Sequence, residues 1–174
     1  IYFIQQTNDG GYIFGGNMGV YGGSQFSLIK ISSNGDIEWQ KNYDDVDSST
    51  GRPYSLQQTS DGGYIVVGYN FISLELHDIF VIKLSFDGSV EWNKIYRGSG
   101  DDLPRSIQQT NDGGYVVSSQ TNSFGAGGYD IWILKLASDG MIEWQKTYGG
   151  SGDERPYSLQ LTNDGGYIVA GQTN

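Results

Sequence analysis

The side chains best suited to bind a metal ion or to catalyse a reaction are carboxylates that follow short glycine-rich runs. Asp101 and Asp102 follow one Gly-Ser-Gly run, and Asp153 and Glu154 follow another. Carboxylate oxygens are the ligands that Ca²⁺ prefers, and two carboxylates about 5 to 9 Å apart in a pocket can hydrolyse a glycosidic bond. No segment has the spacing of an EF-hand loop, and most charge clusters simply face solvent. We therefore expect no resident metal or cofactor, with Ca²⁺ as the alternative.

Other catalytic chemistry has little support in the sequence. His77 is the only histidine and the chain has no cysteine, so it cannot build a histidine-based triad, a histidine metal site or a thiolate site on its own. The Gly98–Asp101 run lacks the lysine and the following helix of a phosphate-binding loop. We assign no catalytic residue.

Aromatic side chains in variable segments are better candidates for ligand contact, because packing explains exposed loop aromatics less easily. Together with two of the acids they form the predicted ligand-binding set, which is Tyr21, Tyr69, Phe71, Asp101, Phe124, Tyr129 and Asp153. Trp39, Trp92 and Trp144 could stack on sugars, but their fixed place in a repeated motif predicts core packing instead.

An internal repeat of about fifty residues sets the elements that position these side chains. The motif Gln-Gln-Thr-Asn-Asp-Gly-Gly-Tyr and its variants occur four times, and their tyrosines are Tyr12, Tyr64, Tyr115 and Tyr167. A second motif, Lys-[Ile/Leu]-x-x-[Asn/Asp]-Gly-x-[Ile/Val]-Glu-Trp, occurs three times, starting at Lys30, Lys83 and Lys135. The chain is therefore expected to be one region with repeats at approximately 1–53, 54–104 and 105–156 and a half repeat at 157–174.

Each full repeat predicts four β-strands joined by tight turns. In the second repeat the strands are expected at Tyr54–Thr59, Gly63–Tyr69, Ile79–Leu84 and Val90–Tyr96. The second and third strands are apolar on both sides, as in sheets that are covered on both faces. Neighbouring blades cover a β-propeller blade in this way. The predicted fold is all-β, a propeller of four-stranded antiparallel blades in which fourteen strands make about three and a half blades.

The hairpin registers follow from turn geometry. A three-residue loop ending in a left-handed Gly88 fixes the third–fourth hairpin. It predicts the opposed pairs Leu84–Val90, Lys83–Glu91 and Ile82–Trp92, with Leu136–Ile142, Lys135–Glu143 and Leu134–Trp144 in the third repeat and Lys30–Glu38 in the first. The first–second hairpin predicts Leu56–Val66 and Ile107–Val117. Each Lys–Glu pair, if exposed, is worth well under about 1 kcal/mol.

The loops of alternating strands sort onto two faces. The short hairpins share one face, while the loops between second and third strands share the other with the blade-to-blade connections. This second face varies most between repeats, as binding surfaces on rigid scaffolds do. Besides the acids named above, it carries Asp44, Asp45, Asp47, Glu75, Asp78 and Asp130.

The string DGGYIVAGQT, together with FGAGGYDIWILKLASDGMIEWQKTYGGSGDE, resembles a repeat of secreted or cell-surface bacterial and archaeal propeller proteins of unknown function. Its layout is distantly similar to Kelch and WD40 propellers. The resemblance covers essentially the whole chain, implies an extracellular or cell-surface location, and carries over no catalytic residue. The first repeat departs from it, because Asp44–Gly51 replaces Gly-Gly-Ser-Gly-Asp.

The composition argues against some classes of binding partner. A net charge of −10 disfavours nucleic acid and anionic membranes, and no apolar run approaches 18 residues, so we expect no membrane insertion. We expect a non-catalytic scaffold for protein or glycan recognition. The alternative is an enzyme acting on polysaccharide, as a lyase or glycosidase, or a quinoprotein-like oxidoreductase. An open arc of blades predicts closure by further chain or by a homodimer.

Overall fold

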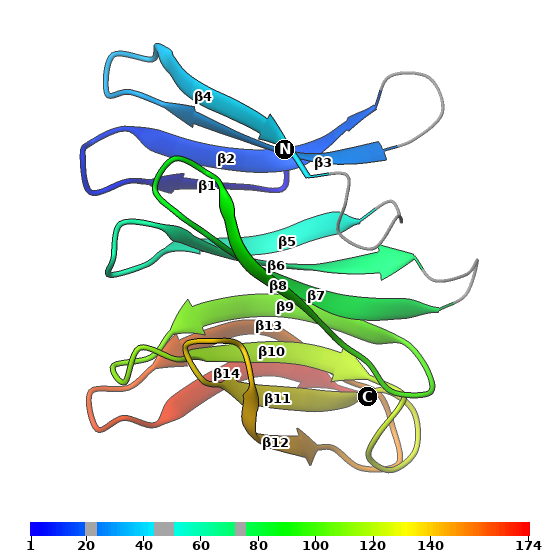
Figure 1. Cartoon of the computed structure of the whole chain (residues 1–174). Coiled ribbons are helices and arrows are strands. Elements are labelled where there is room, and N and C mark those ends of the chain that lie inside the picture. The colour runs from blue at the N-terminus through cyan, green and yellow to red at the C-terminus, as the bar shows by residue number, and fades with distance from the viewer. Residues whose placement is uncertain (20–23, 44–50, 72–75) are drawn as a thin grey trace.

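The computed structural model describes residues 1–19, 24–43, 51–71 and 76–174. They form fourteen β-strands in antiparallel sheets that stack one upon the next, as Figure 1 shows. Three sheets have four strands and the last has two. The predicted all-β propeller of three blades and a half-blade is confirmed. Within the described residues no helix could span a membrane.

In each full blade the strands pair in chain order, and we call them A, B, C and D. Blade 1 contains β1 (Phe3–Gln6), β2 (Tyr12–Gly19), β3 (Ser24–Ile31) and β4 (Ile37–Asn42). Blade 2 contains β5 (Arg52–Gln58), β6 (Tyr64–Phe71), β7 (His77–Leu84) and β8 (Val90–Tyr96). Blade 3 contains β9 (Asp102–Gln109), β10 (Tyr115–Thr121), β11 (Asp130–Leu136) and β12 (Ile142–Tyr148). The half-blade contains β13 (Glu154–Leu161) and β14 (Tyr167–Thr173).

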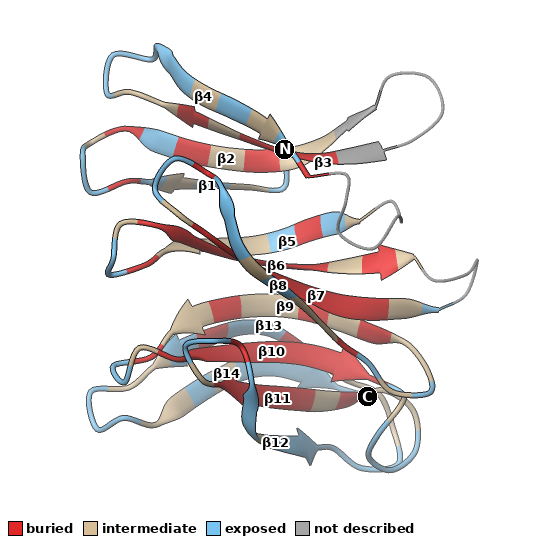
Figure 2. Cartoon of the chain, in the orientation of Figure 1, coloured by how far each residue is buried: buried red, intermediate tan, exposed pale blue. Residues whose placement is uncertain are grey.

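The A strands form the inner edge of the stack. β1 contacts β5, β5 contacts β9 and β9 contacts β13, so the A strands of successive blades lie side by side. The D strands lie at the opposite, outer edge, and β12 is largely exposed (Figure 2). In blades 2 and 3 the B and C strands between them are the most buried, as their apolar sequences predict.

The repeated glutamines of strand A join the blades along this inner edge. In each case the side-chain oxygen of a glutamine accepts a hydrogen bond from a backbone N–H in strand A of the next blade. The pairs are Gln5 with Gln58 (2.8 Å), Gln57 with Gln109 (2.6 Å) and Gln108 with Leu161 (3.2 Å). The Gln-Gln motif therefore repeats because every blade must be linked to the next.

Apolar packing between blades forms the core. Strand D of one blade lies against the C–D turn of the next: the hydroxyl of Tyr43 donates to the carbonyl of Gly88 at 2.8 Å, and that of Tyr96 to Gly140 at 2.6 Å. The predicted core role of the tryptophans is confirmed, because each packs on the first tyrosine of strand B in the next blade. The ring pairs are Trp39 with Tyr64 (5.9 Å), Trp92 with Tyr115 (5.9 Å) and Trp144 with Tyr167 (6.0 Å).

The hairpin registers are confirmed near the turns. Gly88 has a φ of 78°, and Leu84 pairs with Val90. The other confirmed pairs are Leu136 with Ile142, Leu56 with Val66 and Ile107 with Val117.

One step further from the C–D turn, the predicted register is wrong. Lys83 lies opposite Trp92 rather than Glu91, because a β-bulge shifts the pairing between Lys83 and Leu84. In the other blades Lys30 lies opposite Trp39, Lys135 opposite Trp144, Ile82 opposite Asn93 and Leu134 opposite Gln145. The bulge places Glu and Trp together across from the lysine, so that the carboxylate can bind the ammonium while the indole packs on the next blade.

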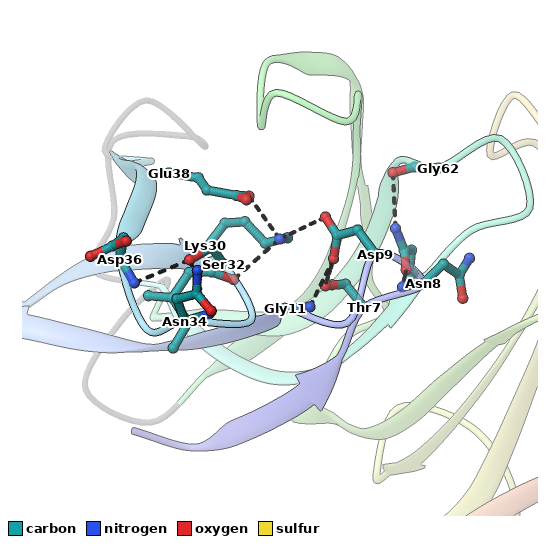
Figure 3. Close-up of polar contacts among 12 residues, drawn as sticks. Thr7, Asn8, Asp9, Gly11, Lys30, Ser32, Asn34, Asp36, Glu38 and Gly62 are labelled. Atoms are coloured by element: carbon teal, nitrogen blue, oxygen red, sulfur yellow. Dashed lines mark hydrogen bonds and ion pairs between the residues drawn. The ribbon is translucent and has the colours of Figure 1, made fainter.

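The lysines of these pairs are buried, so the energy expected for exposed pairs does not apply to them. The ammonium of Lys30 lies 2.9 Å from a carboxylate oxygen of Asp9 in the A–B turn and 2.7 Å from one of Glu38 in strand D, and it donates to the carbonyl of Ile31 (Figure 3). This arrangement, which we call the lysine clasp, joins the two turns of a blade. The equivalents are Lys83 with Asp61 (2.9 Å) and Glu91 (3.2 Å), and Lys135 with Asp112 (2.9 Å) and Glu143 (3.0 Å).

The clasp predicts an asymmetric response to mutation. The side chain of Lys83 is 3% exposed, whereas those of Asp61 and Glu91 are 56% and 46% exposed. Replacing both acids (Asp61→Asn with Glu91→Gln) leaves the buried ammonium of Lys83 without a carboxylate partner. The double substitution should lower the free energy of unfolding by about 3 kcal/mol. Lys83→Met leaves two acids that water can hydrate and should cost less than half as much. Urea unfolding measures both, and a larger loss for Lys83→Met would contradict the account.

Acid should weaken the clasp. Partial burial works to raise the pKa of Asp61, but hydrogen bonds from Thr59, Lys83 and Gly63 outweigh it and lower the pKa from 3.8 to about 2. A carboxyl with a lowered pKa stabilises the fold above its unfolded pKa and loses that contribution as the pH falls through the folded one. Urea midpoints should therefore fall between pH 4 and pH 2, and Asp61→Asn should show a shallower fall. An unchanged slope in that variant would exclude this role.

Candidate functional site

In blades 2 and 3 and in the half-blade, a β-bulge in strand A lies at the end of the strand that faces the B–C loops. In β5 the pairing with β6 passes from Pro53 directly to Ser55, which leaves Tyr54 as the extra residue. The same shift leaves Arg105 unpaired in β9 and Tyr157 unpaired in β13. Bulges redirect side chains and are frequent beside functional sites. The three side chains occupy equivalent positions on the inner edge of the stack.

Each bulged residue contacts the same position of its strand B. The ring of Tyr54 lies 6.2 Å from that of Tyr69, measured between centroids. The other two contacts are hydrogen bonds, from Arg105 to Gln120 (2.9 Å) and from Tyr157 to Gln172 (2.7 Å). We call the set Tyr54, Tyr69, Arg105, Gln120, Tyr157 and Gln172, together with Tyr2 of the first repeat, the inner-edge surface.

The surface is continuous between blades 2 and 3 and is hollowed near blade 1. The guanidinium of Arg105 donates to the hydroxyl of Tyr54 at 2.6 Å and lies 5.2 Å from the centroid of its ring. A cavity of about 310 Å³ opens beside Tyr54, and its described lining is Tyr2, Arg52, Pro53, Tyr54 and Tyr69. Tyr2, Tyr54 and Tyr157 are 50%, 38% and 59% exposed, so their rings are accessible to a ligand.

Two predicted ligand-binding aromatics belong to this region. The ring of Tyr69 lies 5.3 Å from that of Phe71, and the imidazole of His77 lies 4.9 Å from both. The guanidinium of Arg52 lies 5.2 Å from the centroid of the Phe71 ring. Tyr69 thus connects the inner-edge surface to an aromatic cluster at the start of the B–C loop.

The predicted acids Asp101 and Asp153 hold loops in place. A carboxylate oxygen of Asp101 accepts a hydrogen bond from the backbone N–H of His77 at 3.0 Å. The imidazole Nδ1 of His77 lies 2.8 Å from the same oxygen. Asp153 accepts the N–H of Tyr129 at 3.0 Å in the equivalent place, and the hydroxyl of Tyr129 donates to Asp101 at 2.8 Å. Burial, followed by this bond to Asp101, raises the pKa of Tyr129 to about 12. Each acid anchors the start of a C strand, which is a structural role.

Asp102 is a buried acid rather than a surface one. It is fully buried and accepts hydrogen bonds from the hydroxyls of Thr121 (2.5 Å) and Ser123 (3.0 Å) and from the N–H of Gly98 (2.7 Å). Burial raises its pKa, against these hydrogen bonds, which work to lower it. A ligand on the surface cannot reach this carboxylate.

Of the remaining predicted aromatics, Phe124 does not join the inner-edge surface. Phe124 packs on Trp132 with ring centroids 4.9 Å apart and lines a different cavity, of about 210 Å³. Tyr21, Asp44, Asp45, Asp47 and Glu75 lie outside the described residues. Within the described residues no group of three or more His, Asp or Glu side chains could hold a metal ion.

The sequence does contain a signal for the three bulged residues, although they were not among the predicted site residues. Its three prolines are Pro53, Pro104 and Pro156, and each directly precedes a bulged residue. Proline within a strand is typical of edges and bulges. Taking the proline as a bulge marker would have located Tyr54, Arg105 and Tyr157.

No protein-family model matches the chain, and no curated protein matches it. Among solved structures it is similar to the endo-arabinase from Bacteroides thetaiotaomicron VPI-5482, with a TM-score of 0.57 and 14% sequence identity. The match covers 97% of this chain and 68% of the endo-arabinase chain. At this identity the likeness shows the fold alone, and it agrees with the propeller architecture.

The anchoring role of Asp101 predicts a loss of stability when it is removed. Asp101→Ala deletes a charged acceptor shared by His77 and Tyr129 and should lower the free energy of unfolding by about 2 kcal/mol. Exchange of the His77 amide hydrogen should also accelerate. Asp36→Ala, at an exposed hairpin turn, is the matched control and should change little. Equal stabilities of the two variants would show that Asp101 is not an anchor.

Proposed function

We propose that this chain is a non-catalytic extracellular or cell-surface propeller that binds a glycan along its inner-edge surface. The observation that carries the proposal is the repeated bulge, which turns Tyr54, Arg105 and Tyr157 out of strand A at equivalent points of successive blades. A bulge disrupts the strand pairing, so its repetition at accessible aromatic and cationic side chains favours a role in recognition.

The chemistry of the surface suits sugars. Tyrosine offers an apolar ring face, against which the C–H face of a sugar can pack, and a hydroxyl that can donate to or accept from a sugar hydroxyl. Gln172 places an amide beside Tyr157, and Arg105 places a guanidinium beside the ring of Tyr54, where the buried Gln120 accepts a hydrogen bond from it. One such group for each blade matches a polymer of repeating units better than a compact ligand.

The carboxylates favour binding over hydrolysis. A glycosidase requires two carboxyl groups facing one pocket. The described lining of the 310 Å³ cavity contains none, Asp101 and Asp153 hold backbone N–H groups, and Asp102 is buried. The enzyme alternative therefore has the likeness to an endo-arabinase in its favour, and that likeness extends to the fold only.

The proposal predicts which substitutions abolish binding. Affinity electrophoresis in gels containing arabinan, galactan, xylan or homogalacturonan should show retardation by at least one of them. Tyr54→Ala with Tyr157→Ala should weaken that retardation about tenfold or more, because two exposed ring faces are lost. Phe86→Ser is the matched control, since Phe86 is 74% exposed at a C–D turn on the opposite face.

Three outcomes would overturn the proposal. The first is equal retardation of the double variant and the wild type. The second is binding to none of the polymers. The third is release of new reducing ends that stops when a single carboxylate is replaced without loss of fold, which would establish an enzyme.

A further inference from the structure

Arginines and lysines occupy different parts of the blades. Every lysine lies in a C or D strand, where it joins a clasp or the outer edge. Arg52, Arg105 and Arg155 lie in A strands, and the fourth arginine, Arg97, directly follows a D strand. The inner edge is therefore the part of each blade that is supplied with guanidinium groups.

The acids of the A strands are engaged within the protein. The four A strands contain two of them, Asp102 and Glu154. Asp102 is fully buried, and Glu154 accepts hydrogen bonds from the N–H of Gly150 and the hydroxyl of Thr173, both at 2.9 Å. The A strands thus carry an excess of positive charge in a chain whose net charge is −10.

The guanidinium of Arg105 meets neutral groups rather than a carboxylate. It donates to the hydroxyl oxygen of Tyr54 and to the side-chain oxygen of Gln120. Its Nε–H is buried and has no acceptor among the described residues, and none of their carboxylates forms an ion pair with Arg105. Most N–H groups of this cation therefore have no protein acceptor, although a guanidinium binds anions strongly.

The fold does not require a cation at this position. The equivalent bulged residues in blade 2 and in the half-blade are Tyr54 and Tyr157. β9, which carries Arg105, contacts the A strands on both of its sides, β5 and β13. Arg105 is therefore unpaired at a point of the inner edge where the neighbouring A strands are both in place.

Arg105 and Tyr54 together offer donors that suit a carboxylate. Because the hydroxyl of Tyr54 accepts from Arg105, its own hydrogen remains available to a second acceptor. A planar carboxylate can accept from this hydroxyl and from the adjacent guanidinium at once, as carboxylates do with paired donors. The ring of Tyr54 offers an apolar face beside these donors, and Arg52 lines the 310 Å³ cavity on its other side.

We propose, building on the glycan-binding function above, that the ligand is a polyuronate, a polysaccharide whose sugars each carry a carboxylate. One carboxylate binds Arg105 and the hydroxyl of Tyr54, and the adjoining sugar packs on the Tyr54 ring toward the cavity lined by Arg52. The excess of positive charge on the A strands attracts such a polymer to the inner edge, whereas the acidic remainder of the chain repels it.

Two forms of one polymer test the role of the charge. Polygalacturonate and its fully methyl-esterified form have the same backbone, but the second has no carboxylate. Titration calorimetry of the full chain should show binding of polygalacturonate about tenfold or more tighter than of the ester, because charged hydrogen bonds are lost with the ester. Added salt should weaken the first interaction and leave the second nearly unchanged.

Substitution of Arg105 should remove this preference. Arg105→Tyr introduces the residue that the equivalent bulges carry, so the strand should accommodate it. It should weaken binding of polygalacturonate about tenfold and leave binding of the ester unchanged. Arg105→Gln is a second variant with the same expectation. Arg97→Gln removes the same charge from the D–A connection, where Arg97 pairs with Asp78 at 3.7 Å, and is the matched control.

The outcomes separate this inference from the proposed function. Equal affinity for polygalacturonate and its ester, or binding of neutral arabinan or galactan alone, would overturn the polyuronate assignment while glycan binding stands. Binding of dextran sulfate as tight as that of polygalacturonate would show attraction to any polyanion and would also overturn it. An equal loss in Arg97→Gln and Arg105→Tyr would exclude the specific role of Arg105. Binding of none of the polymers would overturn both proposals.

Discussion

The structure depends on one constraint, which is that each blade must be covered on both faces by its neighbours. Strands B and C are apolar on both sides, and residues such as Ile65 and Val66, which are adjacent in sequence and point to opposite faces, are both fully buried. An isolated blade would expose both of these faces to water, which costs about 25 cal/mol for each Å² of apolar surface. Stability is therefore shared between blades, as in other repeat proteins, rather than held within one.

Two polar devices order this packing. The Gln-Gln motif links neighbouring A strands, and the lysine clasp ties the A–B turn of a blade to its D strand. Both fix positions within the hairpin face and the inner edge. The end of strand A that faces the B–C loops varies more between blades, and the bulged Tyr54, Arg105 and Tyr157 lie at this end of the inner edge.

The sequence predicted the fold well because repetition fixed the strands and glycine turns fixed the nearest registers. It failed where a local irregularity decided the outcome. The bulge opposite Lys83 arises because Glu91 binds the lysine while the neighbouring Trp92 packs on the next blade. Acidic residues in loops, such as Asp101 and Asp153, are typical of a solvent-exposed surface. Only the structure shows that these two accept hydrogen bonds from loop N–H groups. The predicted aromatics Tyr69 and Phe71 do come together, but Tyr54 was assigned to an ordinary strand.

Native-state hydrogen exchange of the intact chain tests the central claim, that stability comes from coverage by neighbours. Amides of β6, β7 and β10, which lie in blades flanked on both sides, should exchange most slowly. Amides of β13 and β14, flanked on one side only, should exchange at least about tenfold faster although their own pairing is complete. Equal protection of β13–β14 and β9–β10 would contradict the account, because it would show that each sheet is stable by its own hydrogen bonds.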